Sequence, residues 1–354
     1  MRALAHGLAP IVLSVASTLG VAGEERCAPH DGLAFICGAG AVEDLAPVPG
    51  TSYLLAGGMR FAEPAPIQLI DTVRRAITVA WPRTGAERPD RTNYPDCPGP
   101  PDPSRLSTTG VALQSLTPTS GRFYAVNEGD RRAIEVFDVA TVATRTAPAL
   151  PQLTWVGCIP MPADTNPNAV TPLDGRALAI VSMDDGSQDR MERHVAGDAL
   201  GSVWIWRPVT GLKSLPGIRF RGGNGIAASA DHRRLFVSAW SGAQLLRIAV
   251  DGSEAPQPTQ LPFLPDNVKR QADGSLLVAA QRPPVARIAR CQGPSCPADW
   301  LIARIDPATM RWTLMHEAQG SEAVNYATGA VEHDGRIWIT NRGDGRIGVL
   351  TPRP

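Results

Sequence analysis

The stretch RGGNGIAASADHRRLFVSAW, residues 221–240, holds the pattern that decides the fold. Asn224 and Gly225 open an apolar run, which stops at a turn containing Asp231 and resumes as LFVSAW. Two short apolar runs around a tight polar turn are typical of a β-hairpin. This stretch raises the question of why a strand begins with asparagine, a residue that is depleted in strands.

The same pattern recurs along the chain with a fixed internal distance. The first polar residue and the turn residue are seven positions apart in five copies, which run from Glu43 to Gly50, Asn168 to Gly175, Asn224 to Asp231, Asn267 to Gly274 and Thr328 to Gly335. A sixth copy begins at Thr109 and has a longer turn, TPTSG. Self-similar units of this kind indicate a repeat architecture.

Each hairpin is followed by a further apolar run, such as AIEVFDV, QLLRIAV or RIGVLTP. Units that start at residues 43, 109, 168, 224, 267 and 328 have the spacing of propeller blades. No sustained helical periodicity separates them, as a parallel α/β fold would require. The sequence therefore predicts an all-β, six-bladed β-propeller with four-stranded blades, and an all-β sandwich is the structural alternative.

The repeat also predicts a metal site. In a propeller the first strand of each blade lines the central channel, so its first residue lies at one rim. We therefore expect four blades to bring together Glu43, Asn168, Asn224, Asp266 and Asn267. Their carboxylates and carboxamides offer only oxygen ligands, which suit Ca²⁺ better than zinc or copper. Each asparagine alone is equally explained as a turn residue that satisfies local backbone groups, and the agreement between blades favours the metal site.

Composition and the N-terminal segment bound the partners and the location. Lys and Arg number 34, as do Asp and Glu, so no net charge attracts nucleic acid or an anionic membrane. Residues 1–23 combine Arg2, a short apolar segment and small residues, which is typical of a secretory signal peptide cut near Gly23. A permanent membrane helix is the alternative, but Gly and Pro break the short apolar run. Residues 24–354 are then expected to form a single propeller domain, secreted or periplasmic, without stable membrane insertion.

Six cysteines follow the expected cleavage site: Cys27, Cys37, Cys97, Cys158, Cys291 and Cys296. An even number in an exported chain favours three disulfides. Zinc ligation competes with this interpretation, but the closest pair, CQGPSC, has four intervening residues and no histidine nearby. The sequence does not determine the pairing, for which Cys27 with Cys37 and Cys291 with Cys296 are the local options.

The hairpin geometry places further residues at the mouth of the channel, because a strand that starts at the rim returns to it after the turn. These are Asn127, Glu128, Asp184, Asp185, Trp240, Gln281 and Asn341. The insertion SQDRMERHVAGDALGS, residues 187–202, is interpreted either as a lid over the mouth or as a solvated loop. Its His194 is expected to be exposed, as is His316.

Several segments resemble a known family: EDLAPVPG, YAVNEGDRRAIEVFDV, NPNAVTPLDG, NGIAASADHRRLFVSAW and LPDNVKRQADGSLLVAA. They are similar to the paraoxonase/arylesterase group of the gluconolactonase and senescence-marker-protein superfamily, which are six-bladed calcium-dependent hydrolases. The resemblance covers about residues 40–350. It implies that the catalytic calcium is bound by Glu43, Asn168, Asn224, Asp266 and Asn267. It also implies a second, structural calcium at Asp44 and a carbonyl near Val111, although a third ligand position is Ala169 here.

Two features of that group are missing from this chain. The positions of its histidine dyad, proposed to activate water, are Thr109 and Glu128 here, and its cysteine near the C-terminus has no counterpart. A carboxylate is then the candidate base, either Glu128, Asp184 or Asp266 itself. The sequence predicts a calcium-dependent hydrolase of lactones or aryl esters. The competing hypothesis is a catalytically silent calcium-bound propeller that binds a small molecule or a protein.

Overall fold

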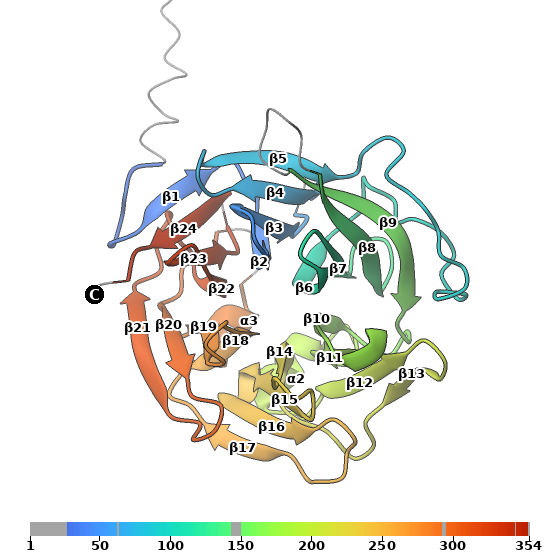
Figure 1. The fold of residues 1–354 in the computed structure, drawn as a ribbon. Coiled ribbons are helices and arrows are strands. Elements are labelled where there is room, and N and C mark those ends of the chain that lie inside the picture. Colours follow the sequence, from blue (N-terminus) through green and yellow to red (C-terminus); the bar gives the residue numbers. More distant parts are fainter. Residues whose placement is uncertain (1–26, 62–63, 143–149, 292–294, 344, 353–354) are drawn as a thin grey trace, which may run out of the picture.

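The computed structural model of this chain describes residues 27–61, 64–142, 150–291, 295–343 and 345–352. Its β-sheets stand around a central channel like the blades of a propeller, and its helices are few (Figure 1). The first strand of each repeat lies innermost, and these first strands contact one another around the channel. The prediction of an all-β propeller with four-stranded sheets is therefore confirmed in its architecture.

Four of the sheets are antiparallel and have four strands each, in sequence order from the channel outwards. One comprises β6 (Thr108–Thr117), β7 (Ser120–Asn127), β8 (Ala133–Val142) and β9 (Leu150–Pro160). The next comprises β10 (Pro167–Pro172), β11 (Leu178–Ser182), β12 (Ser202–Arg207) and β13 (Gly211–Ser214). It is followed by β14 (Gly223–Ala228), β15 (Arg234–Ala239), β16 (Gln244–Ala249) and β17 (Gln257–Gln260). The last comprises β18 (Leu264–Arg270), β19 (Leu276–Gln281), β20 (Trp300–Ile305) and β21 (Trp312–Ala318).

The remaining strands form one eight-stranded sheet, so the count of six separate sheets is corrected. One half holds β2 (Val42–Val48), β3 (Tyr53–Gly58), β4 (Ile67–Asp71) and β5 (Ala76–Trp81). The other half holds β22 (Ala327–His333), β23 (Arg336–Asn341), β24 (Arg346–Leu350) and β1 (Ala34–Cys37). The halves join at a single pair, Val42 with Asn341, where the first and last repeats meet. Pairing of β1 with β24 closes the ring between the two ends of the chain.

The inner hairpins turn where the repeat predicts. Gly274, between β18 and β19, and Gly335, between β22 and β23, have φ angles of 87° and 70°. Glycine adopts this left-handed region without the steric cost that a Cβ imposes. The seven-residue offset in the sequence therefore measures the length of the inner strand that lines the channel.

The hydrophobic core is divided among the interfaces between neighbouring sheets. Trp81 of β5 packs edge-on against Phe137 of β8, with ring centroids 5.7 Å apart, and Phe123 and Trp155 are buried in the same cluster. Aromatic pairs of this geometry contribute about 0.5–1.5 kcal/mol beyond their burial. Because neighbouring sheets cover both faces, β19 is buried throughout, which explains its continuous apolar run.

The described cysteines all form disulfides: Cys27–Cys37, Cys97–Cys158 and Cys291–Cys296. The prediction of three disulfides is confirmed, and both local options are the pairs found. No helix within the described ranges is both long and apolar enough to cross a membrane. The expected signal peptide, residues 1–23, lies outside the described residues.

Two short helices, α2 (Arg190–Ala196) and α3 (Val285–Ala289), lie on the far side of the ring in the view of Figure 1, and they contact each other. The insertion between β11 and β12 forms α2, which ends at Gly197 with a φ angle of 89°. Two 3-10 turns follow inner hairpin strands, η1 (Asp174–Arg176) after β10 and η2 (Trp240–Gly242) after β15. The insertion is therefore an ordered element at the mouth, as the lid interpretation expects.

Candidate functional site

A β-bulge interrupts every innermost strand close to its start. The pairing register shifts between Val42 and Asp44 in β2, Thr108 and Val111 in β6, Pro167 and Ala169 in β10, Gly223 and Ile226 in β14, Pro265 and Val268 in β18, and Ala327 and Ala330 in β22. Bulges re-aim side chains and are over-represented beside active sites. Asn224 begins its strand because the bulge, rather than regular pairing, sets the direction of its carboxamide.

Glycines next to the bulged residues let the inner strands approach one another. A Cβ on Gly110 would lie 2.7 Å from Ala169 Cα, and one on Gly225 would lie 2.4 Å from Val268 N. Cβ atoms do not approach other atoms so closely, so both positions exclude a side chain. The glycine that follows Asn224 therefore keeps the carboxamide close to the neighbouring inner strand.

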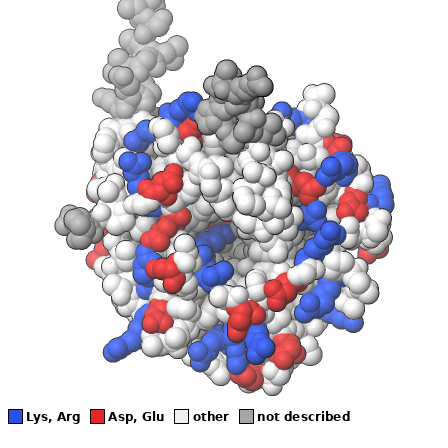
Figure 2. Space-filling view, in the orientation of Figure 1, with Lys and Arg blue, Asp and Glu red and all other residues white. Residues whose placement is uncertain are grey.

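Six of the bulged side chains line one cavity of about 250 Å³ at the channel mouth: Glu43, Thr109, Asn168, Asn224, Asp266 and Thr328. Figure 2 shows the opposite face of the ring, which is also hollowed at its centre and has basic side chains along the wall of the hollow. The lid helix α2 contributes Arg190 and Met191 to the lining, and α3 contributes Ile288 and Ala289. The lid interpretation of the insertion is therefore confirmed over the solvated loop.

Four oxygen atoms of this cavity are buried and have no hydrogen-bond partner among the described residues. They are Glu43 Oε2, Asn168 Oδ1, Asn224 Oδ1 and Asp266 Oδ1, from four different inner strands. An unsatisfied buried acceptor costs about 1–3 kcal/mol. Acceptors that converge without a donor suit a cation, and carboxylate and carboxamide oxygens are the ligands that a hard divalent ion such as Ca²⁺ prefers. The donor set therefore fits calcium.

The other oxygen of each carboxylate is held by a neighbouring amide. Gln281 Nε2 donates to Asp266 Oδ2 over 2.7 Å, while Trp240 Nε1 donates to Gln281 Oε1 over 2.9 Å. Asn267 Nδ2 donates to Glu43 Oε1 over 2.9 Å. Each carboxylate is thus fixed through one oxygen and leaves the other for a ligand. Gln281, the last residue of β19, was predicted to lie at the mouth, but its contact with Asp266 has no signal in the sequence.

Asn267 therefore has a different position from the other predicted ligands. It does not line the cavity, and its amide supports Glu43. In the described part of the chain, no three His, Cys, Asp or Glu side chains gather into a group that would hold a metal ion. An ion in this cavity must consequently take carboxamide oxygens as well as the two carboxylates.

The two carboxyl groups hold protons tightly while no cation is present. Burial, with repulsion from Asp44, raises the pKa of Asp266 to about 7 against the opposing hydrogen bond from Gln281. Burial, then repulsion from Asp266 and Asp44, raises the pKa of Glu43 well above its ordinary value. A divalent cation favours the charged form of both groups. Calcium binding is therefore expected to release protons near neutral pH.

A lysine occupies the region in which the resemblance implies a second calcium. Lys269 Nζ of β18 donates to the carbonyl oxygen of Val111 and pairs with Asp44 Oδ2. Asp44 also accepts from Val111 N over 2.8 Å, and the neighbouring position is the apolar Ala169. The chain therefore supplies the positive charge itself, and these residues do not fit a second divalent ion.

The candidate proton-transfer residues occupy different environments. Glu128 lines the cavity, and burial raises the pKa of its carboxyl group, which Arg190 and Arg342 oppose. Thr109 also lines the cavity, but its hydroxyl donates to Asn168 O over 2.7 Å and so fixes the backbone of a candidate ligand. Asp184 does not line the cavity. It accepts a hydrogen bond from Gly186 N over 2.9 Å and pairs with His194.

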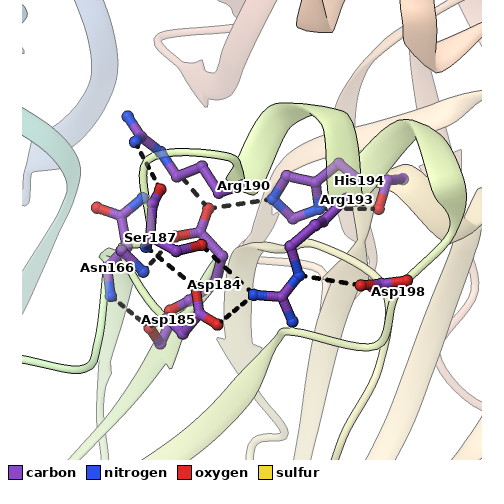
Figure 3. A network of polar contacts seen from close by, with 11 residues as sticks. Asn166, Asp184, Asp185, Ser187, Arg190, Arg193, His194 and Asp198 are labelled. Atoms are coloured by element: carbon purple, nitrogen blue, oxygen red, sulfur yellow. Dashed lines mark hydrogen bonds and ion pairs between the residues drawn. The ribbon is translucent and has the colours of Figure 1, made fainter.

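The prediction that His194 is exposed is wrong. Its side chain is fully buried, its Nε2 lies 3.0 Å from Asp184 Oδ2 and its Nδ1 lies 3.4 Å from Ser241 Oγ. Figure 3 shows this contact within a wider polar network, in which Arg193 also pairs with Asp185 and Asp198. The error arose because the charged insertion was treated apart from the sheet end onto which α2 packs. His194 and Asp184 therefore fix the lid helix to β11.

No protein-family model and no curated protein sequence matches the chain. Among solved structures, the calcium-binding protein regucalcin from Agrobacterium tumefaciens is 13% identical, with a TM-score of 0.51, over 88% of this chain and 90% of that one. A gluconolactonase from Xanthomonas campestris is 15% identical, with a TM-score of 0.50 over 90% of each chain. A PQQ-bound aldose sugar dehydrogenase from Streptomyces coelicolor is 15% identical, with a TM-score of 0.50, over 92% of this chain and 100% of that one.

These likenesses show that the chain shares its propeller fold with gluconolactonase- and regucalcin-like proteins, in agreement with the resemblance in the sequence. The presence of a dehydrogenase among them means that the fold alone does not select the activity. The activity must therefore be argued from the side chains of the cavity.

Proposed function

We propose that this chain is a calcium-dependent hydrolase of lactones or carboxylic (aryl) esters, with its active site in the cavity at the channel mouth. The observation that carries the proposal is the set of four buried, unpartnered oxygens of Glu43, Asn168, Asn224 and Asp266 beside Glu128. The chain would bind Ca²⁺ through these oxygens. A bound calcium ion polarises an ester carbonyl and stabilises the oxyanion that forms from it.

The chain's own residues supply orientation and proton transfer. Gln281 and Asn267 hold the two carboxylates, so that Asp266 and Glu43 each present one oxygen to the cavity. Glu128 is the candidate base, because it lines the same cavity and burial raises the pKa of its carboxyl group toward neutral pH, where a general base is most effective. Met191 of the lid helix and Ile288 of α3 add apolar surface to the cavity and would limit the access of water.

Hydrolysis of a panel of lactones and phenyl esters, with calcium and with a chelator, tests the proposal. We expect calcium-dependent turnover, and Glu128→Gln is expected to lower kcat by about 10²–10⁴-fold. Glu87→Gln is the control, because Glu87 is exposed and lies outside the cavity. Equal turnover with chelator, or an unaffected Glu128→Gln variant, would contradict this role of the ion or of Glu128 respectively.

A catalytically silent propeller is the second candidate. The observation in its favour is that no histidine lines the cavity, whose dyad positions hold Thr109 and Glu128. This protein would bind calcium and a small molecule or protein at the mouth without turnover. Calcium-dependent ligand binding combined with no hydrolysis of any member of the panel would select it.

The wider context of the proposal follows from the same features. We propose that the eight-stranded sheet acts as two blades joined at Val42 and Asn341, which makes a six-bladed ring of residues 24–354. We also propose export through cleavage near Gly23, to a secreted or periplasmic location. The three disulfides support this, because disulfides persist in oxidising compartments.

A further inference from the structure

Two guanidinium groups line the same cavity as the candidate metal ligands, and the hydrolase proposal gives them no function. They belong to Arg342, in the loop after β23, and to Arg190 of the lid helix α2. Arginine is the residue that recognises carboxylate and phosphate groups through paired hydrogen bonds. Their presence beside a candidate metal site therefore bears on the chemistry of the substrate.

Arg342 is held in place but incompletely paired. Its Nη1 donates to Tyr326 Oη over 3.0 Å, and its guanidinium carbon lies 5.3 Å from the centre of the Phe61 ring. Its Nε is buried and has no hydrogen-bond partner, and none of the described carboxylates lies within 4.0 Å of the group. The side chain is half-buried, with an unpartnered Nε and no described carboxylate beside it, so this arrangement favours a ligand that supplies an anion.

Arg190 is fixed by the network of Figure 3. Its Nη1 donates to Ser187 O over 3.1 Å, and its Nε lies 3.9 Å from Asp184 Oδ2 without a hydrogen bond. The pairing of Asp184 with His194 holds the helix that carries Arg190. This guanidinium is therefore positioned before a ligand arrives, which reduces the entropy cost of binding.

The charges of the cavity are consistent with a single anionic ligand. Its lining contains the carboxylates of Glu43, Glu128 and Asp266 and the guanidinium groups of Arg190 and Arg342. With a divalent ion bound, these five side chains and the ion carry one excess positive charge; Asp184, 3.9 Å from Arg190 Nε, lies outside the lining and pairs with His194. Both arginines act on Glu128, yet neither forms an ion pair with it within 4.0 Å. A monoanion is therefore the ligand charge that balances the site.

Resting on the proposed function, we infer that the substrate is a lactone or ester that also carries a carboxylate group. Arg342 and Arg190 would bind this carboxylate. The reacting carbonyl would lie at the cation that the four unpartnered oxygens hold. The apolar part of the lining, from Met59, Met183, Met191 and Ile288, would contact the carbon skeleton between the two polar ends. The inference thus assigns one end of the cavity to recognition and the other to chemistry.

The experiment compares two lactones of equal size with the calcium-loaded protein. One is a γ-butyrolactone that bears a γ-carboxylate, and the other bears a γ-carboxamide. We expect kcat/KM to be about 10- to 100-fold higher for the carboxylate, which is the range for hydrogen bonds to a charged group. Arg342→Gln should abolish this preference by lowering the carboxylate value alone, and Arg342→Lys should retain part of it.

Control variants keep the test independent of folding. Arg311→Gln removes an exposed arginine from the turn between β20 and β21 and should leave the preference unchanged. If Arg342→Gln fails to fold, Arg190→Gln takes its place, with an expected smaller loss of the same preference. Equal kcat/KM values for the two lactones, or equal losses for both in Arg342→Gln, would overturn the inference while leaving the hydrolase proposal standing.

A binding measurement separates the two proposals. The hydroxydicarboxylate that opening of the carboxylate lactone produces is titrated into the calcium-loaded protein by calorimetry, and the corresponding hydroxy-acid amide is the control. Tighter binding of the dicarboxylate that depends on Arg342, combined with no hydrolysis of either lactone, would refute the hydrolase and support carboxylate recognition. Binding that does not depend on Arg342, or no binding and no preference, would refute carboxylate recognition.

Discussion

Removal of calcium is expected to destabilise the folded protein. Glu43 Oε2, Asn168 Oδ1, Asn224 Oδ1 and Asp266 Oδ1 then have neither an ion nor a hydrogen-bond donor among the described residues. In the unfolded chain water satisfies the same atoms, so an ion that binds only the folded state must raise its stability. The perturbation is a chelator against saturating calcium, with Asn224→Ala as the variant that removes one ligand.

The size of the effect follows from linkage. At a free calcium concentration of about 100 times Kd, binding adds about 2.7 kcal/mol to the free energy of unfolding. An unfolding entropy of about 2.1 cal/mol/K per residue gives about 0.7 kcal/mol/K for a propeller of this length, so Tm should rise by about 4 °C. If Asn224→Ala weakens binding about 100-fold, the same calcium concentration equals Kd, and the rise falls below about 1 °C.

Thermal melts of the wild type, Asn224→Ala and Asn93→Ala, each with calcium and with chelator, measure these shifts. Asn93 is the control asparagine, because its side chain bonds Asp90 and Arg176 away from the cavity. Asn93→Ala is expected to lower Tm but to keep the full calcium increment. Coincident melts of the wild type, or an unchanged increment in Asn224→Ala, would refute the assignment of the metal site.

Three further outcomes are expected. In chelator, Tm should fall as the pH rises from about 4 to about 7. The pKa of Asp266 is about 7 in the folded protein against an ordinary value of 3.8, so the protonated carboxyl group stabilises the fold below this window, and the contribution is lost as the group ionises. Asp266→Asn should remove the slope, and a flat wild-type profile in chelator would contradict this expectation. Removing Cys97–Cys158, which spans 61 residues, should cost about 4 kcal/mol in urea denaturation against about 2 kcal/mol for Cys291–Cys296, which spans 5, and equal costs would argue against loop entropy as the cause. Lys269→Met should destabilise the fold by about 3–5 kcal/mol, because it leaves Asp44 buried without its cation. The double variant Lys269→Met, Asp44→Asn should recover most of this loss. Additive losses in the double variant would show that the pair is not coupled.

The repeat in the sequence was sufficient to predict four of the side chains that meet at the channel mouth, although Asn267, predicted with them, lies outside the cavity. A fixed offset from Asn224 to Asp231, repeated from Asn168 and Asn267, identifies equivalent positions in successive hairpins, and the propeller brings equivalent positions together. Glu43, Asn168, Asn224 and Asp266 accordingly line one cavity. The sequence could not predict the single pair between Val42 and Asn341 that merges two sheets, because this contact depends on ring closure between residues far apart in the chain.

Contacts made by side chains beyond the repeat were also out of reach of the sequence. His194 follows a charged run that is typical of a solvated surface, but α2 packs its imidazole against Asp184. Gln281 ends the second strand of its hairpin, which indicated a position near the mouth and nothing about its partners, and Arg342 was not predicted from the sequence. Their roles depend on contacts with Asp266, at the bulge of the paired strand β18, and with Tyr326, in the loop before β22. Period and spacing locate positions, whereas pairing requires the three-dimensional register.

The energetic cost of the cavity is itself an argument for function. Four unsatisfied buried oxygens at about 1–3 kcal/mol each amount to a large part of the 5–15 kcal/mol by which a typical protein is stable. Apolar residues of similar volume at Asn168 and Asn224 would avoid this cost without disturbing the bulges, since the backbone and the neighbouring Gly225 determine them. A fold that keeps carboxamides there, holds Asp266 through Gln281 and neutralises Asp44 separately with Lys269 is consistent with selection for a bound cation at the mouth. Stability and the proposed chemistry therefore depend on the same occupant, and the melts with Asn224→Ala test both.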